Sequence, residues 1–413
     1  MECLISWTFH NWTEGVKMKL EKIHLENFKT FKEMTIKDLP ALCVFVGANG
    51  AGKSTLFDVF SFLKDCLESN VGKALRQRGD FREVVSRGEH ERNICIEIQY
   101  RTEITKRKRL VTYHLEIGRE QGKVCVVEEF LRYKRGSSGS PYYFFRFSKG
   151  KGSAVTNEED FSKTDEKLNR ETQDLGSSEI LALKGLGQFE KFKAANELRA
   201  FIENWHVSNF HVEASRGLKD AAMYAEHLSE TGDNLQAVAK NIHEHHSEIF
   251  AAIVRKMQRR VPGVSGIETK DTEDGRLLLK FRNGDFRDPF IDRYVSDGTM
   301  KMFAYLVLLH DPAPHQFLCI EEPENQLYPT LLHELAEEFR DYAQRGGQVF
   351  VSTHSPDFLN AVELDEVFWL EKENGFTVVK RARDDQQIAA YMADGDQMGS
   401  LWKQGLMGKV DPR

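Results

Sequence analysis

The chain has 413 residues, of which 40% are apolar and 11% aromatic. This composition supports one large or two moderate hydrophobic cores and excludes an intrinsically disordered chain. The formal net charge of −7 excludes a uniformly basic surface, so nucleic-acid binding would need local basic patches. The longest helix-like apolar run, Met302 to Leu309, is far too short to span a membrane. We expect a soluble globular protein with no membrane partner.

The N-terminus and the cysteines bear on location. The first 17 residues contain aromatic side chains but no basic n-region and no long apolar segment, so they do not resemble a secretory signal. We interpret residues 1–17 as an extension, which leaves Met1 and Met18 open as the true start. The six cysteines are scattered without CxxC spacing, and several fall inside predicted core strands. This usage predicts a reducing, cytoplasmic location.

A glycine-rich turn follows the first buried strand. The run Ala41 to Val46 predicts that strand, and Ser54 to Leu67 predicts a helix. Between them lies the pattern GxxxxGK[ST], in which backbone N–H groups and a lysine surround a triphosphate while a hydroxyl binds Mg²⁺. The predicted ATP-binding residues are Gly47, Asn49, Gly50, Ala51, Gly52, Lys53, Ser54 and Thr55. Lys53 is expected at the β- and γ-phosphate oxygens and Ser54 at Mg²⁺.

The middle of the chain predicts a different organisation. Alternating strands from Ile94 to Phe147 indicate an antiparallel sheet beside the nucleotide-binding core. We interpret the polar stretch from Lys149 to Ser178 as a loop or poorly ordered insert. Ile180 to Trp205 and Leu235 to Arg260 are predicted helices. No heptad pattern persists long enough for an extended coiled coil, so any arm is short.

A short polar motif precedes the predicted helix from Met300 to Leu309. Ser296 and Gly298 stand at its start, where serine and glycine form an anion site. Taken alone, the sequence SDG is an ordinary helix cap. Its place between the phosphate loop and an acidic motif favours phosphate binding by Ser296 and Gly298.

Two adjacent carboxylates follow the next buried strand, Phe317 to Ile320. Glu321 is suited to hold Mg²⁺ through its water shell, and Glu322 is suited to orient or deprotonate the attacking water. A further strand, Gln348 to Ser352, leads to His354. Ligand groups gather at the carboxyl ends of strands in such sheets, so we expect His354 to contact the γ-phosphate and to act in catalysis with Glu322.

In this order the motifs resemble the ATP-binding-cassette (ABC) type ATPases of the RecF, SMC and OLD group, and most closely the stand-alone "predicted ATPase" proteins of the AAA-21 kind. Glu321 to Pro329 resembles the Walker B and D-loop segment, Ser352 to Pro356 the switch-histidine segment, and Ile23 to Phe31 the opening strand and turn. The resemblance covers residues 19–105 and 290–385 well and the middle weakly. It implies an α/β P-loop NTPase fold of the ABC-ATPase head type, with a mixed core sheet, an antiparallel β-lobe and a helical insert.

The resemblance also implies a division into four segments. Residues 1–17 form the N-terminal extension, and 18–105 form the N-terminal part of the head with the Walker A loop. Residues 106–290 form the β-lobe and a helical lid or insert. Residues 291–413 form the C-terminal part of the head, with the signature, Walker B and switch histidine.

Three positions depart from the family pattern. Glu321 stands where ABC-type ATPases usually carry aspartate, and Ser-Asp-Gly-Thr from Ser296 replaces the usual Ser-Gly-Gly-Gln. The glutamine that senses Mg²⁺ has only a weak candidate, Gln99, in an alternating strand. The position of that loop stays open at this point.

The resemblance implies a Mg²⁺-dependent ATPase that forms a head-to-tail homodimer around two ATP molecules. Ser296 and Gly298 of one subunit would bind the γ-phosphate held by the phosphate loop of the other. Related families act in DNA repair and anti-phage defence, so we expect a switch that acts on DNA and controls a separately encoded nuclease or Toprim-like effector. The alternative is a nucleotide-gated sensor or scaffold with slow hydrolysis and a protein or RNA partner. A transporter motor is disfavoured by the SDGT signature.

Two basic patches are candidates for contact with double-stranded DNA. One is Lys106 to Arg109; the other, along one face of a predicted helix, comprises Arg255, Lys256, Arg259 and Arg260. Each patch alone is better explained as solvated surface, and dimerisation would have to align them. Asp394 and Asp396 resemble the DxD of Toprim nucleases, but we interpret them as a turn because little sequence follows His354.

Overall fold

The computed structural model describes residues 18–407 except 105–106, 137–139, 159, 161–162, 165–166, 217–218 and 221–223. The predicted extension, Cys3 and Lys106 lie outside the described residues. The chain divides into two compact units. The first unit comprises residues 16–205, 363–396 and 401–413, and the second comprises 1–15, 206–362 and 397–400. Each unit is described by itself.

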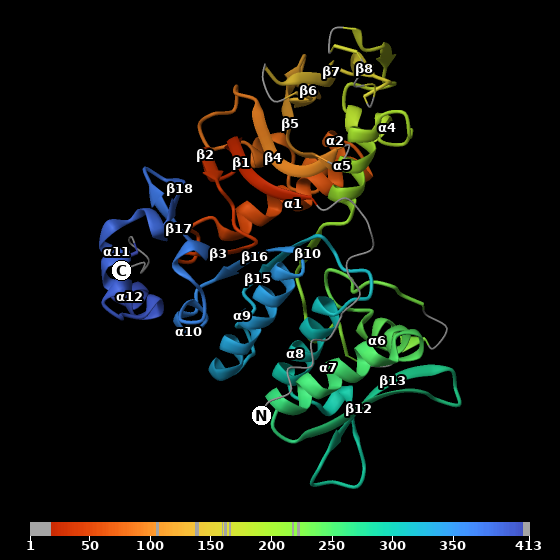
Figure 1. Cartoon of the computed structure of the whole chain (residues 1–413), viewed down its shortest axis with the longest axis vertical. Helices are drawn as coiled ribbons and strands as arrows, with labels where there is room; N and C mark the ends of the chain where they lie inside the picture. Colours follow the sequence, from red (N-terminus) through yellow and green to blue (C-terminus); the bar gives the residue numbers. More distant parts are fainter. Residues whose placement is uncertain are drawn as a thin grey trace. The chain divides into compact units, whose positions relative to one another are not determined.

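An eight-stranded antiparallel sheet dominates the first unit, in the order β2-β1-β4-β5-β6-β7-β8-β9 (Figure 1). Its strands are β1 (Lys19–Phe28), β2 (Phe31–Lys37), β4 (Ile94–Ile104), β5 (Arg107–Glu120), β6 (Lys123–Tyr133), β7 (Tyr142–Ser148), β8 (Lys151–Val155) and β9 (Arg170–Asp174). The antiparallel sheet predicted after Ile94 is therefore confirmed. The prediction of a loop from Lys149 onward is wrong where β8 and β9 add two strands to the sheet, because backbone pairing with β7 outweighs the polar composition.

Helices cover one face of this sheet. They are α1 (Lys53–Glu68), α2 (Val71–Arg76), α3 (Phe81–Val84), α4 (Ala182–Leu186) and α5 (Lys193–Glu203). The ring of Phe62 on α1 lies 5.7 Å from that of Phe28 on β1, and Phe201 on α5 lies 6.3 Å from Tyr100 on β4. Strand side chains alternate between the two faces, so apolar residues of β1 and β4 pack under the helices while the polar residues between them face away.

A second, mixed group of strands in the first unit carries the predicted phosphate loop. The buried strand β3 (Leu42–Val46) pairs in parallel with β17 (Val367–Glu373), which pairs antiparallel with β18 (Phe376–Arg381). The short helices η3 (Leu364–Glu366), η4 (Ala382–Asp384), α11 (Gln386–Ala393) and α12 (Met398–Lys403) complete the C-terminal region. At the end of α11, Asp396 N donates to the carbonyl of Tyr391, which confirms the predicted turn.

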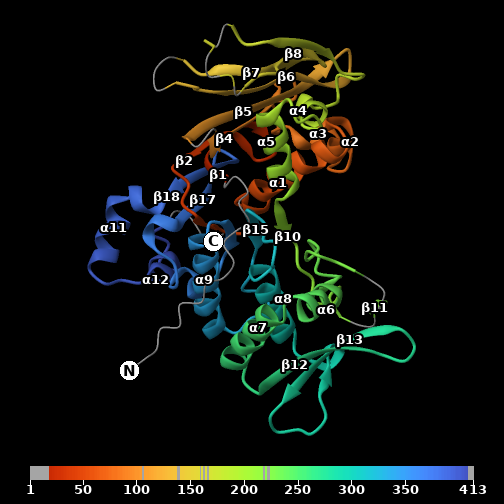
Figure 2. The same cartoon turned by 45° about the vertical axis from the view of Figure 1, so that its right-hand side comes forward.

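The second unit contains three parallel strands, β10 (His206–Ser208), β15 (Phe317–Glu321) and β16 (Gln348–Thr353). They are accompanied by α8 (Asp297–Leu309), α9 (Pro329–Gln344) and α10 (Pro356–Leu359). Helix α8 is buried from Thr299 to Leu309, and its Phe303 contacts Phe281 of a small antiparallel sheet. That sheet comprises β11 (Lys219–Asp220), β12 (Val264–Asp271), β13 (Arg276–Asn283) and β14 (Phe290–Ile291), followed by η2 (Asp292–Tyr294). Its β12–β13 hairpin lies beside α7 (Ser247–Arg260) in two views (Figures 1 and 2).

Two predicted helices are each divided in the structure. The segment from Ile180 to Trp205 forms α4 and α5, and the segment from Leu235 to Arg260 forms α6 (Leu235–His245) and α7 (Ser247–Arg260). His246 has φ −137°, outside the helical range, so the backbone turns between α6 and α7. Within the described residues, no helix is both long and apolar enough to cross a membrane. The five described cysteines are free thiols, four of them buried.

Candidate active site

The glycine-rich turn lies between β3 and α1, as its sequence predicts. Gly50 and Gly52 have φ values of 80° and 111°, a region that residues with a side chain rarely adopt. A Cβ on Gly47 would lie 2.7 Å from the carbonyl oxygen of Leu370. The close approach of Leu370 leaves room for glycine only at position 47. The loop therefore has the backbone geometry that a phosphate-binding cradle requires.

Lys53 occupies the centre of this loop. Its buried Nζ donates to the carbonyl oxygens of Gly47 at 2.7 Å and Ala48 at 3.3 Å. When a phosphate binds in the loop, this ammonium is in position to contact the phosphate oxygens in place of the two carbonyl oxygens. Ser54, the next residue, has an exposed side chain in the first turn of α1. This arrangement fits a triphosphate and a Mg²⁺ ion at the serine hydroxyl.

Two threonines support the loop, Thr377 from β18 and Thr30 from the turn between β1 and β2. Thr377 on β18 donates from Oγ1 to the carbonyl oxygen of Ala51 at 2.7 Å, and its Oγ1 lies 2.9 Å from that of Thr30. Its backbone N–H donates to the Thr30 carbonyl at 2.8 Å. The sequence analysis missed Thr30 and Thr377, because no local pattern marks a contact between residues so far apart in the chain.

In the second unit, the acidic pair lies where β15 ends. Glu321 is the last residue of the strand, and Glu322 has φ 42°. The backbone N–H of Glu322 donates to the carbonyl of Ser352 on β16 at 2.9 Å, which ties the turn to the neighbouring strand. Asn325 Nδ2 donates to Glu322 Oε2 at 3.1 Å. This left-handed turn and the amide together set the direction of the Glu322 side chain.

His354 lies beside Glu322, as the order of the motifs predicted. Its Nδ1 is 3.3 Å from Glu322 Oε1 and 3.3 Å from Glu324 Oε1. Glu324 is nearly buried and accepts from Thr353 Oγ1 and from the backbone N–H of His354, both at 2.8 Å. The carboxylate of Glu324 therefore fixes the strand end that carries the histidine. Glu324 belongs to the motif that carried the resemblance, but nothing in that motif predicts this role.

Lys301 is a further residue that the sequence analysis missed. It is the buried lysine of α8, and its Nζ donates to the carbonyl oxygens of Asn325 at 2.8 Å and Glu322 at 3.4 Å. Burial lowers the pKa of Lys301 to about 8, against the opposing effect of Glu324 and Glu322. The sequence feature that could have marked this residue is a lone lysine inside an otherwise apolar helix. Lys301 holds the turn that follows β15.

The predicted signature residues lie at the start of α8. Ser296 is the N-cap, and its Oγ accepts from the backbone N–H of Thr299 at 3.3 Å. A Cβ on Gly298 would lie 2.7 Å from the carbonyl oxygen of Gln326, so glycine allows this turn to pack against the D-loop segment. Arg216 donates to the carbonyl oxygen of Val295 at 2.7 Å and pairs with Asp297, which fixes the turn.

The two units thus carry different parts of the predicted site. Lys53 and Ser54 belong to the first unit, whereas Glu321, Glu322 and His354 belong to the second, as do Ser296 and Gly298. The acids and the histidine are brought together within the second unit. Gln99 is a half-buried residue of β4 that pairs with Lys22 and Thr112, and its role as a Mg²⁺ sensor stays a prediction.

A family model described as "AAA_21: AAA domain, putative AbiEii toxin, Type IV TA system" matches residues 42–360. This match covers most of the chain, from β3 to the helix after His354. The chain belongs to the AAA_21 family.

Individual proteins and solved structures are also similar to this chain. The chain is 18% identical over 244 residues to the Old nuclease of Escherichia phage P2, and the alignment covers 49% of this chain and 42% of that relative. It therefore spans less than half the length of this curated relative. Among solved structures, the SMC head bound to the C-winged helix domain of ScpA matches with TM-score 0.52 and 14% identity, over 87% of this chain and 97% of that one. An SMC head with an extended coiled coil from Pyrococcus furiosus gives TM-score 0.49, also at 14% identity, over 91% and 100%.

These findings confirm the expected fold and family. This AAA_21 protein has an α/β fold of the ABC-ATPase head type, and its similarities support an ABC-type ATPase of the RecF/SMC/OLD group. Family membership supports a nucleotide-dependent ATPase. The roles of the individual residues, from Gly47 to His354, stay predictions that the local geometry supports.

Proposed function

We propose that this AAA_21 protein is a cytoplasmic, Mg²⁺-dependent ATPase whose ATP-driven head-to-tail dimer acts as a switch in DNA metabolism or anti-phage defence. The observation that carries hydrolysis is the position of His354 Nδ1, 3.3 Å from Glu322 Oε1 at the end of two parallel strands. A carboxylate oriented in this way is suited to accept the proton of an attacking water. The similarity to the Old nuclease supports an action on DNA, exerted through a separately encoded nuclease.

In this mechanism the protein positions groups and stabilises charge. Backbone N–H groups of the glycine loop and Lys53 bind the β- and γ-phosphates of ATP. Mg²⁺, held by Ser54 and through water by Glu321, would offset the phosphate charge. Glu322 orients and deprotonates the attacking water, and His354 contacts the γ-phosphate. Most of the work is positioning, because phosphoryl transfer needs little covalent chemistry from the protein.

The second part of the proposal is that Ser296 and Gly298 act on the nucleotide of a partner copy. Ser296 and the N-terminus of α8 form a prearranged anion site, held by Arg216 through Val295 and Asp297. In a head-to-tail dimer, each of two sites combines the phosphate loop of one chain with Ser296 of the other. This arrangement makes nucleotide state a control of dimerisation.

Mixing two inactive variants tests that arrangement. Lys53→Ala and Ser296→Arg should each be inactive alone, while an equal mixture forms hybrid dimers in which one of two sites is intact. Half of the dimers are hybrids, so the mixture should recover roughly a quarter of the wild-type rate. No recovery, with both variants folded and able to dimerise, would contradict shared sites.

A second experiment separates chemistry from binding. Glu322→Gln should reduce ATP turnover by at least about 100-fold and accumulate an ATP-bound dimer, measured by light scattering. Glu337→Gln, at an exposed position of α9, is the matched control and should behave as wild type. A monomeric Glu322→Gln variant that retains turnover would refute the assigned role.

The basic patch on α7 forms ion pairs with a neighbouring helix. In α7, Lys256 and Arg260 pair with the buried carboxylate of Glu338 on α9, and Arg260 also pairs with Glu334. Two of the four basic residues predicted on this helix face therefore form ion pairs within the second unit. Lys256 and Arg260 are less available to DNA phosphates than the other two residues, because buried Glu338 requires positive partners.

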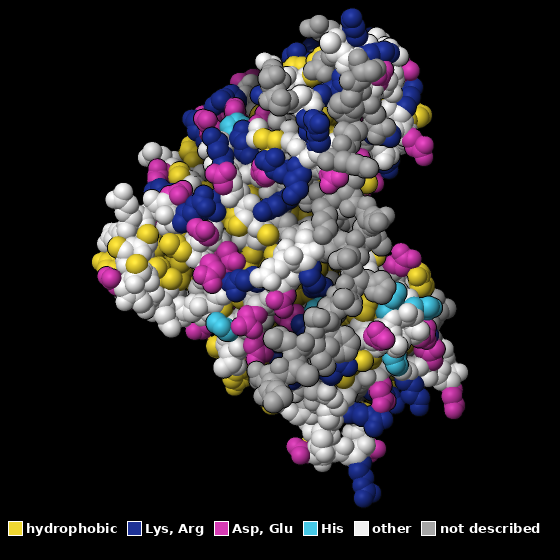
Figure 3. Space-filling view, in the orientation of Figure 1, with side chains coloured by type: hydrophobic (Ala, Val, Ile, Leu, Met, Phe, Trp, Pro, Cys, Tyr) yellow, Lys and Arg dark blue, Asp and Glu magenta, His cyan; other side chains and the backbone are white. Residues whose placement is uncertain are grey.

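The basic residues of β5 offer a better surface for DNA phosphates. A pocket of about 300 Å³ is lined by Lys108 and the buried Arg109 of β5, together with Arg132 of β6 and Lys134. In Figure 3, lysine and arginine side chains are spread over the lobe of β1, β4 and β5, with acidic ones between them. We propose this pocket as the DNA-contacting surface of the first unit.

Double-stranded DNA distinguishes the two functional hypotheses. DNA should raise the ATPase rate, and Lys108→Ala/Lys134→Ala should weaken DNA binding and reduce its salt dependence, with a change in log–log slope of about 2. Lys123→Ala/Lys151→Ala, elsewhere in the same lobe, is the control. If DNA changes neither rate nor dimerisation, the alternative of a slow nucleotide-gated sensor with a protein or RNA partner is favoured.

A further inference from the structure

The outer face of the antiparallel sheet carries a group of metal-binding residue types that the proposed ATPase does not use. On β1 and β4, Ile23, Leu25 and Ile96 point into the core and are fully buried. The residues between them face the other way and are half-buried, among them His24 and Cys95. The sequence analysis treated the cysteines as packing residues, so this side of the sheet was not considered.

The strand register brings these residues together. Glu26 on β1 is the direct partner of Cys95 on β4, and His24 pairs with Glu97. On the other side of β4, Glu97 pairs with His114 of β5. Cys95 therefore lies diagonally between two histidines on three adjacent strands. Such diagonal neighbours on one sheet face are within reach of each other's side chains.

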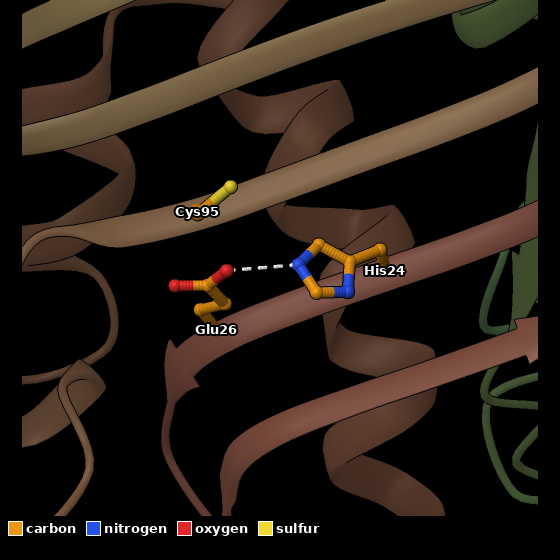
Figure 4. Close-up of side chains that lie close together, drawn as sticks. All are labelled: His24, Glu26 and Cys95. Carbon is orange, nitrogen blue, oxygen red and sulfur yellow. Dashed lines mark hydrogen bonds and ion pairs between the residues drawn. The ribbon is translucent and has the colours of Figure 1, made fainter.

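We propose that His24, Glu26, Cys95 and His114 bind a divalent transition-metal ion of the zinc class; these four residues are called the Cys95 cluster. The ligand atoms of His24, Glu26 and Cys95 lie within 4.8 Å of one another. Figure 4 shows His24 and Glu26 pointing toward each other, with Nε2 2.9 Å from Oε1, and Cys95 beside them on the neighbouring strand. Cys95 Sγ is 3.8 Å from His114 Nδ1, which adds the fourth ligand.

Two of these separations can be compared with those of a tetrahedral site. With Zn–S of about 2.3 Å and Zn–N of about 2.1 Å, a sulfur and a nitrogen ligand lie about 3.6 Å apart. The Cys95–His114 separation is close to that value. The shorter His24–Glu26 contact needs to open to about 3.4 Å, the separation expected for a nitrogen and an oxygen ligand, as a metal ion replaces the bridging proton.

Outer contacts orient both histidines. His24 Nδ1 lies 2.7 Å from the hydroxyl oxygen of Thr35 on β2, which leaves Nε2 directed toward Glu26. The ring of His114 stacks on Phe130 with a centroid separation of 4.6 Å and an interplanar angle of 5°. Histidine ligands are held in this way when the second ring nitrogen or the ring face has a fixed partner.

The charge around the cluster favours a cation. The carboxylates of Glu26, Glu116 and Glu97 surround the Cys95 thiol. The same carboxylates that disfavour a thiolate would stabilise a dication, and a bound dication would favour the thiolate in turn. A thiolate with imidazoles and one carboxylate suits Zn²⁺ or Co²⁺ and is a poor set for Mg²⁺ or Ca²⁺. Such an ion would cross-link β1, β4 and β5.

Cobalt titration of the full chain tests the proposal without ATP. After chelator treatment, Co²⁺ should bind at one equivalent and give a thiolate-to-cobalt charge-transfer band with the intense visible bands of a tetrahedral ion. Zn²⁺ should remove these bands, and a large excess of Mg²⁺ should not. Zinc should also raise the thermal midpoint of unfolding, because it binds the folded lobe preferentially.

Variants identify the ligands. Cys95→Ser should abolish the charge-transfer band, and His24→Asn or His114→Asn should weaken Co²⁺ binding at least tenfold. Cys125→Ser and His90→Asn, elsewhere in the first unit, should retain both band and affinity. If Cys95→Ser fails to fold by circular dichroism, Glu26→Gln supplies the test and should weaken binding at least tenfold. Binding without the band, or a band that persists in Cys95→Ser, would overturn the proposal.

Discussion

The hydroxyl of Thr377 lies 2.7 Å from the carbonyl oxygen of Ala51 and donates a hydrogen bond to it. This contact joins β18, near the end of the chain, to the phosphate loop near its beginning. The loop of this AAA_21 protein is therefore supported by a strand that the loop's own sequence does not specify.

Replacing Thr377 with valine should weaken nucleotide binding. Thr377→Val keeps the shape of the side chain and removes a hydrogen bond worth about 1 kcal/mol, so the Kd for ATP should rise roughly fivefold. Thr102→Val is the matched control, because the Thr102 hydroxyl is buried on β4 and has no hydrogen-bond partner among the described residues. Equilibrium titration with a fluorescent ATP analogue measures both, and equal affinities in the two variants would contradict a supporting role for Thr377.

Adding one carbon at Gly47 should have a larger effect. In Gly47→Ala the new Cβ would meet the Leu370 carbonyl oxygen at 2.7 Å, so the loop or β17 has to shift. We expect ATP affinity to fall more than about tenfold and the thermal midpoint to decrease. Gly176→Ala, where no atom lies within 4 Å, should leave both unchanged. Unaltered ATP affinity in Gly47→Ala would show that the loop can shift freely.

Lys301 should make stability depend on pH. Its pKa falls from 10.5 in the unfolded chain to about 8 in the folded protein, mainly through burial. Between these values the unfolded chain binds more protons, so this lysine makes the free energy of unfolding rise with pH, by up to about 3 kcal/mol. Lys301→Met removes the titrating group and should remove that rise.

The measurement is chemical denaturation of wild type and Lys301→Met across this pH range. The difference in unfolding free energy, wild type minus variant, should increase between pH 8 and 10.5. Met300→Leu alters packing in the same helix without a titrating group, so its difference from wild type should be constant. A constant difference for Lys301→Met as well would rule out the lowered pKa.

Arg216 should influence dimerisation more than nucleotide binding. Its guanidinium donates to the carbonyl oxygens of Val295 and Arg293 and pairs with Asp297, which together fix the turn that carries Ser296. Arg216→Gln should weaken the ATP-dependent dimer about tenfold, as expected for loss of charged hydrogen bonds. Sedimentation of a Glu322→Gln background with and without the change measures this.

The control for Arg216 is Arg282→Gln, which removes an exposed ion pair with Glu268 and should change dimerisation less than about twofold. ATP affinity should be the same in both variants. A loss of ATP affinity in Arg216→Gln that accounts for the weaker dimer would assign this arginine to folding rather than to the signature turn.

How much of the site could be predicted depended on how local each feature is. The Gly47 to Thr55 loop follows from a few successive residues, because its glycines, lysine and hydroxyl act together only in one backbone path. Glu322 and His354 could be paired in advance, since the ends of neighbouring parallel strands meet at one edge of a sheet. By contrast, the roles of Glu324 and Lys301 depend on contacts that exist only in the folded turn after β15.

The phosphate loop, the acids, the histidine and the family could be predicted from the sequence alone, because each depends on residues close together in the chain and on the chemistry of their side chains. The tertiary structure decided what lies beside them: Thr377 under the loop, Glu338 between Lys256 and Arg260, and Cys95 between two histidines. These contacts join residues that are distant along the chain. Strand register and helix packing bring them together, and neither follows from a local pattern of residue types.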